Sequence, residues 1–310
     1  MNRLDRALRA AILAAADNAY VRRAVGRYGM RMGAKRFVAG ETADDLLRVA
    51  RAANARGFGV AGGILGESVR DREEAVAAAD QYCSLLRAFA DRGIDANVAF
   101  KLSHVGLDLD PELAFDNAVR IAETAQATGN TVRIDMEQSR YVDATLQAYR
   151  RLRGRFDCVG FALQAYLFRS ASDLEAMLAL RPNVRIVKGA YLEPPSVAYA
   201  RKSDVDENYV RLAESALSHD GYTAIATHDP AIVQRVERFA AANGLPKRGR
   251  FEFQMLYGIG ALLARSLVER GYRVRLAVPF GDDWFPYLMR RLAERPANLA
   301  FFLKGALTRG

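Results

Sequence analysis

The sequence predicts an α/β protein built as a (β/α)8 TIM-like barrel with an N-terminal helical arm. Eight short runs rich in Val, Ile and Phe have the pattern of strands, and helical segments separate them. Eight strands that are each followed by a helix are the number that closes such a barrel. No linker rich in Gly, Ser or Pro divides the 310 residues into two halves.

The first 56 residues are expected to form the helical arm. Every segment from residue 2 to about residue 56 has a helical pattern, with a loop signal at Ala39-Gly40. Thr42 is a good N-cap for the last of these helices, because Asp44 and Asp45 follow it in the first turn. We therefore predict two domains, the arm over 1–56 and the barrel over 57–310.

The strands and helices of the barrel follow from their periodicity. The predicted strands are 58–65, 97–103, 131–137, 158–164, 184–189, 223–228, 250–256 and 273–279. The predicted helices are 71–92, 112–127, 142–153, 171–180, 208–217, 231–243, 261–270 and 284–307. An open doubly wound sheet is the competing fold, but the glycines after the first strand do not form G-x-G-x-x-G. The barrel is favoured.

Composition limits the classes of function. The 51% of hydrophobic residues excludes a disordered chain. The net charge of +9 suits acidic small molecules or an anionic membrane surface, whereas the basic residues are too dispersed for nucleic-acid binding. Cys83 and Cys158 are the only cysteines, which indicates a reduced cytoplasmic setting. The apolar run at 10–16 is too short to span a bilayer, so we expect a soluble, unprocessed protein.

Polar residues gather at the carboxyl ends of the predicted strands, where barrel enzymes carry their active sites. Alternation along the strands turns four of them toward the barrel interior: Lys101, Asp135, Gln164 and Gln254. Four more lie on the fifth strand or at the ends of the fifth and sixth strands: Arg185, Lys188, Thr227 and His228. Because buried unpaired charge is costly, the set indicates either a dense network of ion pairs or a site for a polar ligand.

The last helix carries a second cluster. Tyr287, Arg290, Arg291 and Glu294 fall on one face of it. Two neighbouring arginines can bind a carboxylate or a phosphate with parallel charge-assisted bonds, or they form an exposed basic patch braced by Glu294. Glu67, after the first strand, is an acid that could pair with these arginines when no ligand is bound.

Several kinds of chemistry lack their motifs. None of the three histidines has metal-ligand spacing with another histidine or with a cysteine, so no metal site is expected. The chain has neither a P-loop nor a nucleophile elbow.

Eight short motifs together resemble the proline dehydrogenase family. They are Leu65-Gly66-Glu67, Lys101-Leu102-Ser103, Arg133-Ile134-Asp135-Met136-Glu137, Leu163-Gln164-Ala165-Tyr166, Arg185-Ile186-Val187-Lys188-Gly189-Ala190-Tyr191, Ala226-Thr227-His228-Asp229, Phe251-Glu252-Phe253-Gln254 and Tyr287 to Pro296. They follow the order and spacing of that family from residue 37 to residue 303, and the N-terminal helices look like the arm of its monofunctional bacterial members.

The resemblance implies a flavin-dependent barrel that oxidises L-proline to Δ1-pyrroline-5-carboxylate by hydride transfer to N5 of FAD. A quinone would reoxidise the cofactor, which fits a cytoplasmic enzyme with peripheral contact to the inner membrane. Arg185 would lie beside N5, with Lys101 and Asp135 as the other catalytic residues. The resemblance assigns the remaining cofactor contacts to Gln164, Lys188, Gly189, Ala190, Tyr191, Thr227, His228 and Gln254.

The resemblance also implies the residues that bind the substrate. Arg290 and Arg291, joined by Lys101, would hold the carboxylate, so the helix at 284–307 would be a substrate-binding helix over the barrel mouth. Leu256, Ala277 and Tyr287 would enclose the ring, and Glu67 would pair with Arg290 in the empty site.

This chain departs from the family pattern at four positions. Ala277 stands where the family has a tyrosine that shields the substrate ring, and Gly63 stands where it tends to have an aspartate. Asp282 and Phe285 replace residues that are commonly Arg and Tyr. The same chemistry on hydroxyproline or another substituted cyclic secondary amino acid therefore stays open. Two other classes also stay open, a Schiff-base aldolase using Lys101 or Lys188 and a non-catalytic carboxylate-binding relative.

Overall fold

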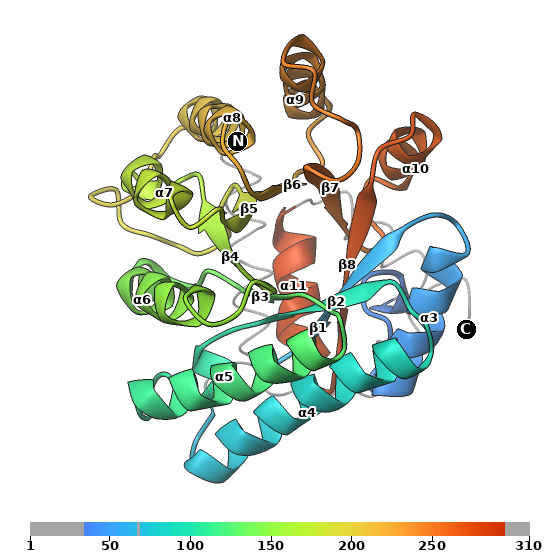
Figure 1. The fold of residues 1–310 in the computed structure, drawn as a ribbon, viewed down its shortest axis with the longest axis vertical. Coiled ribbons are helices and arrows are strands. Elements are labelled where there is room, and N and C mark those ends of the chain that lie inside the picture. The colour runs from blue at the N-terminus through green and yellow to red at the C-terminus, as the bar shows by residue number, and fades with distance from the viewer. Residues whose placement is uncertain (1–33, 67–68, 295–310) are drawn as a thin grey trace.

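Eight parallel strands close a barrel at the centre of the protein in the computed structural model, which describes residues 34–66 and 69–294 (Figure 1). Each strand pairs with the next along the chain, and β8 pairs with β1. The strands are β1 (Gly59–Ile64), β2 (Ala96–Phe100), β3 (Val132–Ile134), β4 (Val159–Gln164), β5 (Asn183–Val187), β6 (Tyr222–Ala226), β7 (Phe251–Leu256) and β8 (Val274–Phe280). The predicted (β/α)8 barrel is confirmed.

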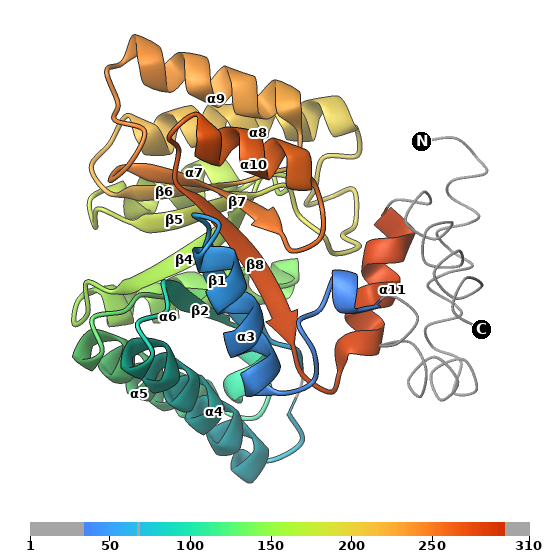
Figure 2. The ribbon, with the colours of Figure 1, turned by 90° about the vertical axis from the view of Figure 1, so that its right-hand side faces the viewer.

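Helices surround the barrel and cover one end of it. They are α3 (Ala43–Asn54), α4 (Arg72–Asp91), α5 (Pro111–Ala127), α6 (Val142–Arg153), α7 (Ser170–Leu178), α8 (Lys202–Leu217), α9 (Pro230–Ala242), α10 (Ala261–Glu269) and α11 (Trp284–Glu294). Since α3 packs against β1 and β8, it takes the eighth position around the barrel. The helix after β8 is then free to lie at the carboxyl end of the strands, where Figure 2 shows α11.

α3 begins as the sequence predicts. The Thr42 hydroxyl accepts a hydrogen bond from the Asp45 backbone N–H at 3.2 Å, and the Asp45 carboxylate accepts one from the Thr42 N–H at 3.3 Å. These two bonds form a capping box. The predicted domain boundary at residue 56 stays a prediction, because residues 1–33 of the proposed arm lie outside the described residues.

Several predicted boundaries differ from the structure; β5 and β6, for example, end at Val187 and Ala226, two residues before their predicted ends. β2 and β3 end at Phe100 and Ile134, so Lys101 and Asp135 follow the strands. After β2 the chain turns into a short 3-10 helix that begins at Ser103. α8 begins at Lys202, six residues before the predicted start at residue 208. Its first turn is polar and carries no apolar periodicity from which the helix could be recognised. The predicted last helix reaches 307, of which residues 295–307 lie outside the described part.

The two faces of the barrel wall differ in character. Apolar residues at alternate positions, such as Val98, Phe100 and Phe161, are fully buried against the surrounding helices. The opposite face of the strands carries polar side chains into the barrel, among them Arg133 and Glu252. The barrel interior is thus polar. Its end at the carboxyl termini of the strands is where barrel enzymes carry their active sites.

Candidate active site

A buried arginine and an aspartate form an ion pair at the barrel mouth. Arg185, in β5, is 8% exposed and pairs with Asp135, which follows β3. The backbone N–H of Asp135 donates to the Phe100 carbonyl at 2.8 Å and so fixes the end of β3 against β2. Lys101, half-buried, follows Phe100 at the matching position on the neighbouring strand. The structure therefore brings together the three residues predicted to be catalytic.

The charge of Arg185 persists despite its burial. Burial lowers the pKa of Arg185 to about 9, and the nearby Arg133 charge acts in the same direction. The guanidinium is still protonated at neutral pH and stays paired with Asp135. Among the described residues, the Nε of Arg185 has no hydrogen-bond partner. A buried donor of this kind fits a ligand that brings an acceptor to the mouth.

Gln164 is held by the backbone of a buried glutamate. Its Nε2 donates to the Glu137 carbonyl at 2.8 Å, and the Glu137 carboxylate accepts from the Ser103 backbone N–H at 3.1 Å and from the Ser103 hydroxyl. Because the amide nitrogen is used within the protein, the amide oxygen of Gln164 is the atom suited to a ligand. Sequence analysis assigned no role to Glu137, although alternation along the predicted strand placed it on the same inward face as Asp135.

Lys188 belongs to a cluster of alternating charges. Its Nζ lies 2.6 Å from Asp206 Oδ1 in α8 and 3.1 Å from Asp229 Oδ2. Lys202 pairs with the same two carboxylates. Burial acts to raise the pKa of Asp229, but its bonds to Lys188 and Lys202 outweigh that and hold it below the usual value. Asp206 and Lys202 were missed by sequence analysis because they lie in the polar first five residues of α8, which precede the predicted start of that helix.

The residues after Lys188 follow a tight turn. Gly189 has a φ of +114°, and a Cβ there would lie 2.3 Å from the Tyr166 ring, so only glycine fits. Ala190 is exposed and Tyr191 is half-buried. The turn thus presents backbone beside Lys188, where a ligand can approach closely.

Thr227 and His228 directly follow β6. The Thr227 hydroxyl accepts from the Asp229 N–H at 3.1 Å, and His228 Nε2 accepts from the Leu256 N–H at 2.9 Å. The Nδ1 atom of His228 therefore carries the proton of the neutral ring. His228 also lies beside the start of α10, since a Cβ on Gly260 would be 3.1 Å from its ring.

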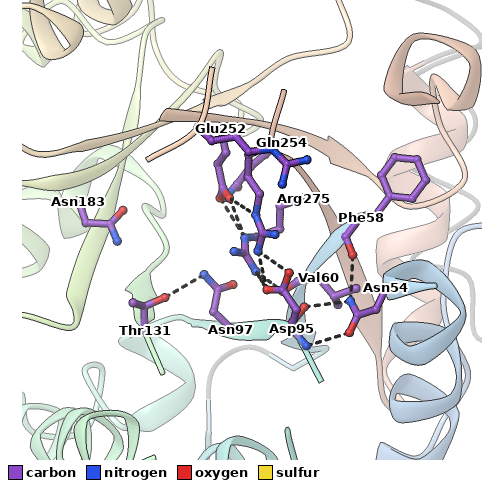
Figure 3. A network of polar contacts seen from close by, with 12 residues as sticks. Asn54, Phe58, Val60, Asp95, Asn97, Thr131, Asn183, Glu252, Gln254 and Arg275 are labelled. Carbon is purple, nitrogen blue, oxygen red and sulfur yellow. Dashed lines mark hydrogen bonds and ion pairs between the residues drawn. The ribbon is translucent and has the colours of Figure 1, made fainter. Parts of the chain in front are cut away.

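Beneath the mouth lies a network of polar side chains, which we call the barrel floor: Asp95, Arg133, Asn183, Glu252, Gln254 and Arg275. The two arginines, Glu252 and Gln254 are buried, whereas Asp95 is exposed. Figure 3 shows Asp95, Glu252 and Arg275 in this network. Arg275 Nε donates to both oxygens of Glu252 at 3.0 Å, and Gln254 Nε2 donates to one of them at 2.6 Å. Arg133 donates to Asn183. The sequence offered an ion-pair network and a ligand site as alternatives; the structure shows such a network in the floor and a separate group of charges above it.

Small residues form one side of the mouth. Ala277 lies next to Leu256 of β7 and next to Ala61 of β1 in the barrel sheet. Gly63 is the inward-facing position of β1 that follows Ala61. A Cβ placed on it would meet no heavy atom within 4 Å among the described residues. Gly63 and Ala277, two of the departures from the family pattern, therefore lie on adjacent strands and leave space on the same side of the barrel mouth.

α11 places Tyr287 and Arg291 at the carboxyl end of the strands. The Arg291 guanidinium lies 5.3 Å from the centre of the Tyr287 ring, so the two predicted neighbours are in contact. Trp284 anchors the helix, since its Nε1 donates to Glu41 at 3.0 Å. Phe285 is buried beside Trp284, whereas Asp282 is exposed. The side chains of Arg290 and Glu294 and all of Glu67 lie outside the described part of the chain.

The donors and acceptors at the mouth fit a flavin dinucleotide. Arg185 and Lys188 offer positive charge and Gln164 offers an amide oxygen, while Gln254 offers an amide oxygen from the barrel floor beneath them. Within the described residues, two buried atoms of this group, Arg185 Nε and Gln254 Oε1, have no hydrogen-bond partner. The helices of the described residues include none that could span a bilayer.

Comparison with known proteins gives one consistent result. Residues 46–304 match the model of the family described as proline dehydrogenase. The proline dehydrogenase of Deinococcus radiodurans is 42% identical over 309 residues, covering 98% of this chain and 99% of its own. Proline dehydrogenase 1 of Bacillus subtilis subsp. natto is 41% identical over 280 residues, covering 90% and 92%.

A solved structure shares the fold. Proline utilization A from Bdellovibrio bacteriovorus, inactivated by N-propargylglycine, superposes with a TM-score of 0.81 at 26% identity. The match covers 87% of this chain and 33% of that one, so this chain spans about a third of the longer protein.

Proposed function

The chain belongs to the proline dehydrogenase family, and we propose that it oxidises L-proline, or a ring-substituted relative, with FAD as the hydride acceptor. The observation that carries the proposal is the convergence of Lys101, Asp135 and Arg185 from three strands on one end of the barrel. Family membership implies a flavin cofactor and favours flavin chemistry over the Schiff-base aldolase and the non-catalytic relative.

Residues at the mouth would hold the cofactor and the substrate in contact. Arg185, Gln164 and Lys188 would bind the edge of the flavin ring, while Thr227 and His228 would bind the nucleotide portion. When bound, FAD supplies a ring that accepts a hydride. Because hydride transfer needs close placement of the donor carbon and little acid–base machinery, binding residues would supply most of the catalysis.

The substrate would lose a hydride from C5 and a proton from its nitrogen, so that a C5=N double bond forms. Its nitrogen must be neutral when the hydride leaves, because a protonated amine has no lone pair to donate. Cations near the amine favour the neutral form, and Lys101 and Arg291 would provide them. The same cations would bind the substrate carboxylate.

We propose a quinone as the acceptor of the two electrons from the reduced cofactor. The net charge of +9 supports contact with an anionic membrane surface, where quinones reside. Mixing the reduced protein with a water-soluble quinone should restore the oxidised flavin spectrum faster than air does.

The proposal is tested by the colour of the protein. Purified protein should be yellow, and its flavin absorbance should bleach under anaerobic conditions when a substrate is added. A panel of L-proline, hydroxyproline and pipecolate would identify the preferred ring. Colourless protein that takes up no added FAD would contradict the proposal.

Ala277 and Gly63 favour a substituted ring as a second candidate substrate. Replacing Ala277 by tyrosine should fill the space that these two residues leave, and so raise the preference for unsubstituted proline over hydroxyproline. One group in a substrate pocket typically changes such a ratio by about 10-fold or more. The measurement is the ratio of kcat/KM for the two substrates, with Ala277→Val as the control. A ratio that does not move would contradict the role of Ala277.

A further inference from the structure

Gln254 occupies a central position in the barrel. It points inward from β7, between Ala226 of β6 and Arg275 of β8, and is 2% exposed. Its Nε2 donates to Glu252, while its Oε1 has no hydrogen-bond partner among the residues that the structure describes. A buried amide oxygen without a partner is unfavourable, so this atom calls for a donor from a ligand.

Glu252 determines which way the Gln254 amide faces. Glu252 is 1% exposed and receives Arg275 Nε on both oxygens at 3.0 Å. Burial acts to raise the pKa of Glu252, but the charges of Arg275 and Arg133 outweigh it and hold that pKa below its ordinary value. The carboxylate is therefore ionised and can only accept hydrogen bonds. Gln254 must turn its NH2 group toward it, and its oxygen must face elsewhere (Figure 3).

The direction of the strand shows where that oxygen can be used. Glu252 precedes Gln254 by two residues on the same face of β7, so Glu252 lies nearer the amino end of the barrel. The amide nitrogen points toward the floor, and the oxygen is left on the side that a ligand at the mouth can reach. Phosphate oxygens and a substrate carboxylate have no proton to donate to it. The flavin N3–H and the hydroxyls of its ribityl chain do.

We propose that Glu252 is a positioning residue that fixes the Gln254 amide, so that its oxygen accepts a hydrogen bond from an N–H or O–H group of the bound cofactor. The inference rests on the proposed function, because it takes FAD as the ligand. It assigns to Glu252 a part in cofactor binding besides its part in the stability of the barrel floor.

A purely electrostatic role for Glu252 makes the opposite prediction. The three buried arginines of the described chain, Arg133, Arg185 and Arg275, all occupy inward-facing positions of their strands by alternation. Neutralising Glu252 would raise the positive potential beneath the mouth and so favour the anionic diphosphate of FAD. Loss of the fixed amide would instead weaken FAD binding. The sign of the change in affinity separates the two roles.

The test is a double-mutant cycle on FAD affinity. The dissociation constant for FAD is measured by flavin fluorescence for Glu252→Gln, Gln254→Leu and the double variant, together with the midpoint of thermal unfolding. Each single variant should raise the constant about 10-fold, and the double variant should raise it no further, because both act through one atom. Asp95→Asn is the matched control. Asp95 pairs with Arg273 and Arg275 in the same network, and no hydrogen bond joins it to Gln254 among the described residues.

The outcomes are distinct. The proposal is overturned if Glu252→Gln leaves FAD affinity unchanged or increases it while Gln254→Leu weakens it, or if the two effects multiply in the double variant. Should Glu252→Gln fail to fold, Glu252→Asp keeps the charge and withdraws the carboxylate from Gln254, and it must also weaken FAD binding. A wild-type protein that binds no FAD would overturn the proposed function itself.

Discussion

Arg185→Met is expected to slow the reduction of the flavin by substrate about 10²- to 10³-fold, the usual loss when one electrostatic donor is removed from a reaction centre. Methionine keeps most of the volume of the arginine side chain and removes its charge at the mouth. The variant should still fold, because the partner Asp135 has a side chain that is 30% exposed and can be solvated. Anaerobic stopped-flow absorbance measures the rate constant directly.

Two further variants separate the effect of the positive charge of Arg185 from the effect of its planar guanidinium. Arg185→Lys keeps the charge and loses the planar fork that pairs with Asp135, so its rate should fall between those of the wild type and Arg185→Met. Lys202→Met is the control, since Lys202 is mostly exposed and carries charge on the outer side of the Lys188 cluster. A rate for Arg185→Met within a fewfold of the wild-type rate would show that Arg185 does not contact the reacting atoms.

The fold was predictable because the barrel repeats one simple pattern. Each strand puts alternate apolar residues against the helices, and that alternation is visible in Val98 and Phe100 or in Val159 and Phe161. Turns and strand ends are less regular. Lys101 follows β2 because the chain turns into a 3-10 helix two residues later, a change that periodicity does not register.

The inward residues of the candidate site were predictable for the same reason, but their partners were not. Parity places Gln254 in the barrel without showing that Arg275, from another strand, fixes Glu252 beneath it. Asp206 binds Lys188 across 18 positions of the chain, from a helical turn that looks like a polar loop in the sequence. Such pairings depend on how separate elements meet in space.

The second large effect is expected on substrate binding, from an arginine of the last helix. Arg291→Ala should raise the KM for the amino acid about 100-fold, since truncating one partner of a buried, hydrogen-bonded charge pair typically costs about 2–5 kcal/mol. Arg291 is half-buried against Tyr287 on α11, at the end of the barrel toward which the strands point. The flavin content should not change, because the predicted cofactor contacts lie on β4 to β7 and the loops after them.

The form of the kinetic change identifies what Arg291 does. A residue that binds the carboxylate equally in the ground state and the transition state raises KM and leaves kcat nearly unchanged, whereas one that acts only in the transition state lowers kcat. Arg291→Lys should recover only part of the affinity, since a point charge cannot form two parallel bonds. Arg48→Ala, an exposed arginine on α3, serves as the control. A KM that stays at the wild-type value in Arg291→Ala would remove Arg291 from the substrate site and leave the carboxylate to Lys101 and Arg290.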